Sequence, residues 1–396
     1  MIVGVPAETY PEERRVAQVP VTVPLLVKAG LELLVEQGAG TSAGFSDVTY
    51  EEQGGRIAPD RKRLLSSADA LLYVRGLGAN PDAGRADLEL MRSGQLVVGL
   101  LNPLGAPEAA RDLAGKGVTA FALELLPRIS RAQPMDVLSS MATVAGYKAA
   151  LMAADALPRM YPMMITAAGT VTPARVFVVG AGVAGLQAIA TSRRLGAVVQ
   201  SYDVRPAVKE QVESLGARFL ELELQTEEAE TAGGYARAMG DEFYSRQREM
   251  MAQVVAESDV VITTAAVPGG KAPVLITGEM VQGMRAGSVI VDLAAEGGGN
   301  CELTQPGESV EVDGVTILGP LNLPSTVPYH ASQMYARNVA AFLQNLVKDG
   351  ELRLDMEDQI ISDSLLTHDG EVVNPRVREL LGLPASVPAA EERSDG

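Results

Sequence analysis

The fold is decided by the stretch Arg175-Val-Phe-Val-Val-Gly180-Ala-Gly182-Val-Ala-Gly185-Leu-Gln-Ala-Ile189. A run of β-branched and aromatic residues ends at Gly180, and an apolar helical pattern begins after the glycines. The spacing G-x-G-x-x-G between a strand and a helix is typical of a dinucleotide-binding turn. Gly180 allows the tight turn, Gly182 lets the backbone approach a pyrophosphate, and Gly185 allows the helix to pack closely on the strand. The amino terminus of that helix would then face the phosphates.

An acidic residue follows the next predicted strand. Asp203 ends the run Val198-Val-Gln-Ser-Tyr-Asp203, which places it 18 residues after Gly185. A carboxylate at this position can accept hydrogen bonds from both hydroxyls of an adenosine ribose, and it repels a 2′-phosphate. We therefore predict that the chain binds NAD(H) in preference to NADP(H). The alternative interpretation is a glycine-rich turn followed by a solvated aspartate.

Two further turns follow strands of the same predicted sheet, at residues 263–269 and 293–300. Ligands of open α/β sheets bind beyond the carboxyl ends of the strands, so both turns are candidate cofactor contacts. Each could also be a tight connection and nothing more. Upstream, residues 227–243 combine an acidic stretch with Gly234 and Tyr235. This segment is either a mobile flap over the ligand or the start of a solvated helix.

Strand-like and helical segments alternate along the chain, which is typical of an α/β protein with mostly parallel sheets. Apolar residues at three- and four-residue spacing predict a long helix after Pro134 and a second one at about 331–347. A small β element is expected at 351–373, with a hairpin turn at Asp369-Gly370. The predicted strands are 2–5, 32–35, 70–74, 95–100, 175–179, 198–202, 260–264 and 288–293.

These segments predict two Rossmann-like, doubly wound domains joined by long helices. The first domain is expected to be discontinuous, formed by residues 1–136 and 326–380. The second, at residues 137–325, carries the glycine motif and is expected to bind NAD(H). Residues 381–396 are rich in Pro, Ala and charged residues, so we expect a flexible tail.

The composition excludes several classes of protein. Asp and Glu number 50 against 33 Lys and Arg, and the net charge of −17 has the wrong sign for binding nucleic acid or anionic lipid. One cysteine excludes an intrachain disulfide, and two histidines exclude a three-histidine metal site. The sequence shows neither a secretory signal nor a stretch that we expect to span a membrane. We expect a cytoplasmic protein with no metal, no nucleic-acid partner and no direct membrane insertion.

A polar segment precedes the first predicted long helix. It contains Arg128, Arg131, Gln133, Asp136 and Ser139, close to a predicted domain junction. Clefts form at such junctions. Ordinary helix-start chemistry explains Asp136, which suits the positive end of the helix dipole. It does not explain the two arginines and the glutamine together, so a binding role for this segment is the competing interpretation.

Five segments together resemble the α subunit of proton-translocating nicotinamide nucleotide transhydrogenase. They are LELLPRISRAQPMDVLSS, MMITAAGTVTPARVFVVGAGVAGLQAIAT, DVRPAVKEQVESLGARF, TAGGYARAMGDEF and VIVDLAAEGGGNCE. The resemblance extends over nearly the whole chain, up to about Pro375. It favours the separately encoded NAD(H)-binding form of this subunit, which has no membrane helices of its own.

The resemblance implies roles for individual residues. The loop around the nicotinamide corresponds to Arg128, Gln133, Asp136 and Ser139, and this loop meets the NADP(H)-binding component. Tyr235 corresponds to the tyrosine of a mobile loop. The cofactor-binding residues that it implies are Gly180, Ala181, Gly182, Val183, Gly185, Asp203, Val204, Gly234, Tyr235, Thr264, Ala265 and Ala266.

The resemblance also implies an assembly and a reaction. Such subunits form homodimers and dock on membrane-embedded subunits at the inner face of the cell membrane. One of these, the β subunit, binds NADP(H). The implied reaction is hydride transfer from NADH to NADP⁺, coupled to inward proton movement. Hydride transfer between two nicotinamide rings moves no proton at the reacting carbons, so it requires closeness and orientation of the rings. A chain with only His330 and His368 suits that chemistry.

Two other functions remain open. Alanine dehydrogenase shares the implied fold, and its substrate-binding arginine corresponds to Arg15. The lysine and histidine of that enzyme correspond to Arg75 and Asn102, and neither of these residues can serve as an acid/base at neutral pH. The third interpretation is a non-catalytic NAD(H)-sensing module whose flap controls a protein partner.

Overall fold

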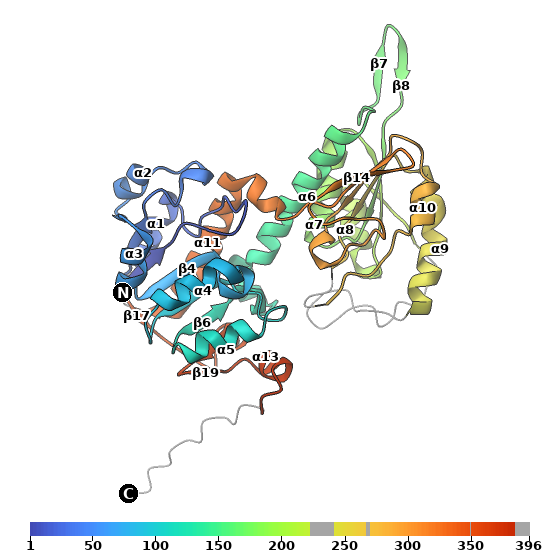
Figure 1. Ribbon diagram of the computed structural model, residues 1–396. Helices are drawn as coiled ribbons and strands as arrows, with labels where there is room; N and C mark the ends of the chain where they lie inside the picture. The colour runs from blue at the N-terminus through green and yellow to red at the C-terminus, as the bar shows by residue number, and fades with distance from the viewer. Residues whose placement is uncertain (222–240, 267–269, 349, 385–396) are drawn as a thin grey trace, which may run out of the picture. The chain divides into compact units, whose positions relative to one another are not determined.

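The computed structural model describes residues 1–221, 241–266, 270–348 and 350–384. The chain divides into two compact units, each with its own sheet (Figure 1). Unit 1 comprises Met1–Leu138 and the described residues from Pro328 onward, and unit 2 comprises Ser139–Val327. The predicted α/β class is confirmed. The predicted domain boundaries stay a proposal beside this division, and most of the predicted tail lies outside the described residues.

Unit 1 contains an eight-stranded sheet in the order β19-β18-β6-β5-β4-β1-β2-β3. The strands from β3 to β6 are parallel, whereas β18 and β19 are antiparallel. Numbered along the chain, the parallel strands have the doubly wound order 3-2-1-4-5-6, which reverses direction between β1 and β4. The strands are β1 Ile2–Val5, β2 Glu32–Glu36, β3 Arg56–Ala58, β4 Ala70–Arg75, β5 Leu96–Leu100, β6 Thr119–Ala122, β18 Leu365–His368 and β19 Glu371–Val372.

Parallel strands are covered on both faces, so they are continuously apolar. In β4, with the sequence ALLYVR, every residue except the last is buried. Glycine at position 4 of the chain, within β1, allows close packing, because a Cβ atom there would lie 2.7 Å from Cβ of Ala68. The helices of unit 1 are α1 Val23–Lys28, α2 Asp47–Glu52, α3 Arg61–Ser67, α4 Pro81–Leu90, α5 Glu108–Gly115, α11 Pro328–Leu346, α12 Gln359–Ser364 and α13 Pro375–Leu380.

Unit 2 contains a seven-stranded sheet in the order β11-β10-β9-β12-β13-β15-β14. Six of its strands again have the parallel order 3-2-1-4-5-6, and β14 is antiparallel at the edge. The direction reverses between β9 and β12. The strands are β9 Arg175–Val179, β10 Val198–Tyr202, β11 Arg218–Phe219, β12 Val260–Thr263, β13 Val289–Asp292, β14 Ser309–Val312 and β15 Val315–Leu318. The helices are α7 Val183–Arg194, α8 Lys209–Ser214, α9 Asp241–Glu257 and α10 Gly278–Gln282.

The stretch predicted as a small β element is only partly β. The hairpin β18–β19 turns at Asp369-Gly370, both with positive φ (48° and 79°), as its sequence predicts. Strands β16 Val347–Lys348 and β17 Glu351–Leu352 form a separate pair. Between them and the hairpin lies helix α12, which the β prediction missed. This six-residue helix is too short for a clear apolar period, and its signal is the N-cap Asp358.

Helix α6 Val137–Ala156 begins three residues after Pro134, which lies inside the 3₁₀ helix η5 Ser130–Met135. With 20 residues and a mean hydropathy of 1.3, it is the one helix in the described part of the chain that is long and apolar enough to span a membrane. Our expectation that no stretch is suited to span a membrane overlooked it, because Lys148 and Asp155 interrupt its apolar run. Core helices also meet this criterion, and 39% of its most apolar stretch is buried.

A β hairpin projects from unit 2 (Figure 1). Its strands, β7 Met164–Thr166 and β8 Gly169–Val171, pair only with each other among the described strands. The side chain of Ile165 is 81% exposed and that of Met163 is 61% exposed. A lone two-stranded hairpin is marginally stable in water. This hairpin therefore presents apolar surface without a sheet to support it.

Close packing of α6 on α7 generates a testable prediction. A Cβ atom on Gly146 would lie 2.0 Å from the carbonyl oxygen of Ala184. We expect Gly146→Ala to lower the free energy of unfolding of unit 2 by about 1–3 kcal/mol, because the two helices must move apart. Denaturant unfolding measures this loss.

The matched control is Gly278→Ala in the same unit, where the nearest atom to a new Cβ would be 3.6 Å away. We expect this variant to unfold at the same denaturant concentration as the parent chain. If Gly146→Ala also unfolded there, α6 and α7 would not be in such close contact.

Candidate functional site

The glycine-rich turn lies at the point where the unit 2 sheet reverses direction. Gly180 ends β9 with φ +99°, and Gly182 caps the start of α7. A Cβ atom on Gly185 would lie 1.8 Å from the carbonyl oxygen of Gly180, so only glycine lets helix and strand pack this closely. A Cβ atom on Gly182 would meet no atom of the described residues within 4 Å. Gly182 therefore borders open space at a helix amino terminus, as a phosphate-binding turn requires.

Thr264, directly after β12, joins this turn. Its hydroxyl donates to the carbonyl oxygens of Val179 (3.3 Å) and Gly180 (3.2 Å), and its N–H donates to Val179 at 2.9 Å. A Cβ atom on Gly180 would lie 2.4 Å from the Thr264 hydroxyl oxygen. The structure thus brings together two loops that the sequence predicts as separate cofactor contacts.

Asp203, at the end of β10, is buried and already bound within the chain. Its Oδ2 accepts from the N–H of Ala181 (2.7 Å) and from the guanidinium of Arg205 (2.8 Å). Its Oδ1 accepts from the backbone N–H and the Nε of Arg205, both at 2.9 Å. The predicted ribose-binding carboxylate therefore lies beside the glycine turn, but it must exchange some of these partners to accept ribose hydroxyls. No sequence motif predicted this contact with Arg205.

A buried carboxylate, Asp292 at the end of β13, organises the loops at this edge of the sheet. Its Oδ1 accepts from the Thr263 hydroxyl (2.9 Å) and the N–H of Ala294 (3.0 Å). Its Oδ2 accepts from the N–H groups of Asn300 (2.7 Å) and Cys301 (2.9 Å) and from the hydroxyl of Thr304, which lies 2.7 Å away. Five donors inside the protein thus satisfy the buried charge.

Asn300 extends this network to the Thr264 loop. Its Oδ1 accepts from the N–H of Ala265 at 2.9 Å, and its Nδ2 donates to the carbonyl oxygens of Ala265 (2.8 Å) and Pro273 (2.9 Å). Asn300 is fully buried. Our predictions missed the roles of Asp292 and Asn300. Their signal is an acidic residue at the end of a strand, followed by a glycine-rich turn that ends in an amide.

The other predicted cofactor residues have varied surroundings. Val183 is the first residue of α7 and is partly exposed, Val204 is partly buried against the core, and Ala266 is exposed. Gly234 and Tyr235 lie outside the described residues, so the flap stays a prediction. Assignment of all these positions to a cofactor remains a prediction as well.

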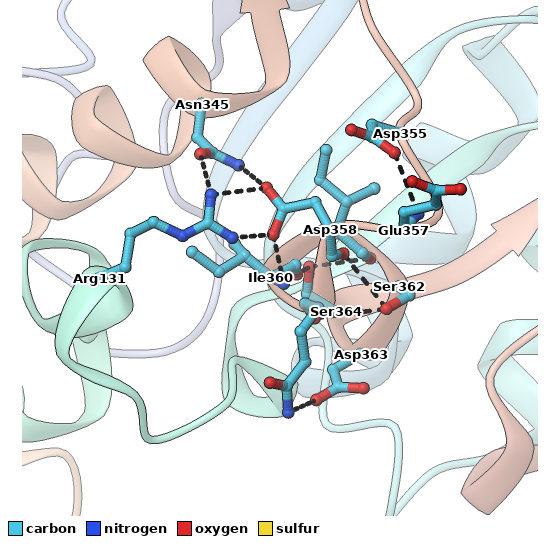
Figure 2. Close-up of polar contacts among 11 residues, drawn as sticks. Arg131, Asn345, Asp355, Glu357, Asp358, Ile360, Ser362, Asp363 and Ser364 are labelled. Atoms are coloured by element: carbon cyan, nitrogen blue, oxygen red, sulfur yellow. Dashed lines mark hydrogen bonds and ion pairs between the residues drawn. The ribbon is translucent and has the colours of Figure 1, made fainter.

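The polar segment that precedes α6 folds as η5. Arg128 and Gln133 are exposed, whereas Asp136 and Ser139 are half-buried. Asp136 directly precedes α6, and its N–H donates to the carbonyl oxygen of Gln133 at 3.2 Å. Ser139 lies in the first turn of α6, where its carbonyl oxygen accepts from the Thr143 hydroxyl. Arg131 points away to an ion pair with Asp358 (Figure 2).

Charged residues fill the reversal point of the unit 1 sheet. Glu8 accepts from the N–H groups of Val74 (2.6 Å) and Arg75 (3.1 Å). The Glu13 carboxylate binds the Arg15 guanidinium through two contacts, at 2.7 and 2.6 Å, and both side chains are buried. Desolvation raises the pKa of Glu8 to about 8, although its two backbone hydrogen bonds oppose the shift. This edge is closed by the chain's own side chains.

The same edge places Glu124 beside Asn102. Glu124 accepts from the N–H of Asn102 at 2.6 Å, and Asn102 adopts a left-handed conformation with φ +49°. Desolvation raises the pKa of Glu124 to about 7, and its Oε2 is buried without a hydrogen-bond partner among the described residues. Asn102 thus contributes backbone geometry here, and its amide side chain cannot titrate.

Metal and thiol chemistry find no support in the described part of the chain. No group of three or more His, Cys, Asp or Glu there could hold a metal ion. Cys301 is buried, and burial raises the pKa of its thiol to about 11. The thiol is therefore protonated at neutral pH and packs in the core of unit 2.

Comparison with known proteins identifies the family of both halves of the chain. The N-terminal domain of the alanine dehydrogenase/PNT family matches residues 4–145, and the C-terminal domain of that family matches residues 149–375. Together these matches extend over nearly all of the chain.

Individual relatives fall into two groups. An NAD(P) transhydrogenase subunit alpha of Rhodospirillum rubrum, in the form that is divided into separate chains, is 47% identical over 378 residues, which is 95% of this chain and 98% of the relative. The crystal structure of transhydrogenase from Sinorhizobium meliloti is 45% identical, with a TM-score of 0.84 over 94% of this chain and 100% of the other. Alanine dehydrogenase of Halomonas elongata is 30% identical over 97% of both chains.

The identity to transhydrogenase α subunits thus exceeds the identity to this alanine dehydrogenase by a wide margin. The shared fold and the predicted oxidoreductase class are confirmed by the same relatives. The chain therefore belongs to the alanine dehydrogenase/PNT family, among the NAD(P) transhydrogenase α subunits, as its sequence motifs predict.

Proposed function

We propose that the chain binds NAD(H) and passes a hydride from NADH to NADP⁺ held by a partner subunit. Membrane-embedded partner subunits, which include an NADP(H)-binding β subunit, couple this transfer to proton translocation. The observation that carries the proposal is the open backbone at Gly182, at the reversal point of the unit 2 sheet, with a buried carboxylate beside it. Family membership supports it, because the relatives are named NAD(P) transhydrogenase subunit alpha.

The unit 2 site fits a dinucleotide. The pyrophosphate would lie against Gly180, Ala181, Gly182 and Val183, where α7 begins and where a Cβ atom on Gly182 would find open space among the described residues. The ribose hydroxyls would bind Asp203 once Arg205 yields part of the carboxylate. Bound NADH supplies the hydride. The role of the chain is to hold, orient and shield the nucleotide.

The nicotinamide ring is assigned to Arg128, Gln133, Asp136 and Ser139. These side chains offer a charge, an amide, a carboxylate and a hydroxyl, which can orient the ring by hydrogen bonds. Transfer between two rings requires no proton transfer at carbon, so none of the four must act as an acid or base. Gln133 is exposed on η5 and is placed to reach toward the second nucleotide.

The alternative, an alanine dehydrogenase-like enzyme, is less well supported. Arg15, which would hold the substrate carboxylate, is buried and already binds the carboxylate of Glu13. Asn102 stands in the place of an acid/base and cannot titrate. That enzyme would therefore require both a rearranged ion pair and a proton acceptor from another residue.

A homodimer is part of the proposal, and the β7–β8 hairpin supports it. A hairpin with an isoleucine that is 81% exposed presents the kind of apolar surface that partners cover. A second copy of the chain can supply the missing support at a two-fold axis. We also propose that the complex works at the cytoplasmic face of the cell membrane, attached through its membrane subunits.

The function is tested by mixing the purified chain with an NADP(H)-binding partner domain and following hydride transfer between nucleotide analogues by absorbance. We expect transfer with the partner and none from the chain alone. Gln133→Asn should slow transfer by about tenfold, because a shortened side chain misaligns the rings, with NADH affinity nearly unchanged.

Two results would contradict this proposal. One is no transfer with any such partner, although NADH binds. The other is oxidation of NADH by the chain alone with pyruvate and ammonium, which would establish the alanine dehydrogenase reaction. Partner binding that depends on NADH without hydride transfer would favour the sensing module.

Two glycine variants separate binding from packing at the proposed pyrophosphate site. Gly182→Ala should fold normally but weaken NADH binding by about tenfold or more, a loss of about 1.4 kcal/mol, because the methyl group occupies the open space. Gly185→Ala should instead destabilise unit 2, since its Cβ atom would lie 1.8 Å from the Gly180 carbonyl oxygen. Calorimetric titration and thermal unfolding measure the two effects. Normal NADH affinity in Gly182→Ala would exclude this site.

The proposed dimer is tested at the hairpin. Ile165→Asp should raise the dimer dissociation constant by about a hundredfold or more, because a charge cannot be buried in an apolar interface without a partner. Analytical ultracentrifugation measures the change. The control is Val48→Asp, a side chain that is 58% exposed in α2 and far from the hairpin in sequence. A dimer that tolerates Ile165→Asp as well as Val48→Asp would place its interface elsewhere.

A further inference from the structure

We infer that Arg131 and Asp358, together with Asn345, position the η5 loop for hydride transfer. In this inference Arg131 is a positioning residue that anchors the loop, and Gln133 two residues later does the work at the nicotinamide. The inference rests on the proposed function, because that function assigns Arg128, Gln133 and Asp136 to the ring. It adds three residues to which neither the family resemblance nor the motifs give a role.

The anchor is a network of three side chains from distant parts of unit 1 (Figure 2). The Arg131 guanidinium binds both carboxylate oxygens of Asp358, with Nη1 at 3.0 Å from Oδ2 and Nη2 on Oδ1. The Asn345 side chain, near the end of α11, completes the network. Its Oδ1 lies 3.5 Å from Nη1 of Arg131, and its Nδ2 donates to Oδ2 of Asp358 at 3.0 Å.

Asp358 is itself held firmly in place. It caps the start of α12, where its Oδ1 accepts from the N–H of Ile360 at 2.9 Å and its carbonyl oxygen accepts from the Ser362 hydroxyl. Its side chain is 11% exposed, against 56% for Arg131. Desolvation alone would raise the pKa of Asp358, but the hydrogen bonds from Arg131, Asn345 and the Ile360 N–H lower it below its ordinary value. The carboxylate therefore stays charged and gives Arg131 a fixed acceptor.

A second contact fixes the other end of η5. The Nδ2 of Asn338, a buried residue of α11, donates to the carbonyl oxygen of Pro134 at 2.7 Å. Gln133 lies between Arg131 and Pro134, so the residues on both sides of it are tied to α11 or α12. The backbone direction at Gln133 is set by these ties, while its side chain stays exposed.

The loop needs such anchors for a physical reason. A 3₁₀ helix has poor hydrogen-bond geometry and is short for that reason, and Pro134 removes one N–H donor from η5. Local bonds alone therefore leave its conformation weakly determined. A bidentate arginine–carboxylate pair fixes both distance and orientation. A partly exposed pair adds little to the stability of a whole domain, so its value here is local order.

The inference is tested on the full chain with two readouts. Amide hydrogen exchange of residues 129–137 reports loop order without nucleotide, and hydride transfer with the partner domain reports function. The variants are Arg131→Ala and Asp358→Asn, since asparagine keeps the N-cap of α12 but loses the charge. The matched control is Arg92→Ala. The Arg92 guanidinium also binds a carboxylate, at 2.9 Å from Asp69, with a similar exposed fraction of 48%.

We expect exchange of residues 129–137 to speed up by about tenfold or more in both variants, and hydride transfer to slow by a similar factor, since small displacements strongly reduce transfer rates. NADH affinity and thermal stability should stay close to those of the parent chain. The double variant should be no slower than the worse single one, because both changes break one anchor. Exchanging the partners, as Arg131→Asp with Asp358→Arg, should restore part of the lost rate. Arg92→Ala should match the parent chain.

Three outcomes would overturn the inference. The first is unchanged exchange of residues 129–137 in Arg131→Ala and Asp358→Asn. The second is faster exchange with a normal hydride-transfer rate, which would remove the loop from the reaction. The third is the same loss of rate in Arg92→Ala. Failure of the proposed function is distinguishable, because the parent chain would then transfer no hydride while the exchange measurement would still decide whether the anchor exists.

Discussion

The candidate nucleotide site depends on one buried carboxylate. Asp292 holds the end of β12 through Thr263 and the glycine-rich turn after β13 through the N–H groups of Asn300 and Cys301. Asn300 then holds Ala265, next to the threonine that closes over Gly180. Because a buried charge without donors is very costly, all five donors must stay in place together. The loops that would surround a nucleotide are thereby preorganised by a residue with no predicted role in binding it.

The two sheets have the same strand order and use their reversal points in opposite ways. In unit 2 the point is built from glycines, with open space in front of Gly182 among the described residues. In unit 1 the same point is filled by Glu8 and by the pair Glu13–Arg15. A ligand must displace a buried ion pair to enter unit 1, whereas at Gly182 it meets backbone. The fold offers two sites, and the side chains close one of them.

The sequence predicts the features that arise from local patterns. Strands 2–5, 175–179 and 198–202 have the predicted bounds, and the Asp369-Gly370 turn follows from residues that tolerate positive φ. Networks across distant segments are not predictable in this way. The pairing of Arg131 with Asp358 joins residues 227 positions apart, and Asp203 lies against Arg205 through a side-chain rotamer that no period encodes. The short helix α12 escapes for the same reason, since its cap is its main signal.

A reaction without proton transfer at carbon changes what a protein must control. Acid/base catalysis demands a tuned pKa, and the raised values at Glu8 and Glu124 belong to the filled edge of unit 1 and serve no such step. Ring-to-ring hydride transfer demands position instead. Position is set by backbone anchors, which in this chain are Asp292 for the glycine-turn side and Asp358 with Asn338 for η5. Two carboxylates that touch no reacting atom thus account for the order of the loops assigned to the nucleotide, and a scarcity of histidine follows from the same demand.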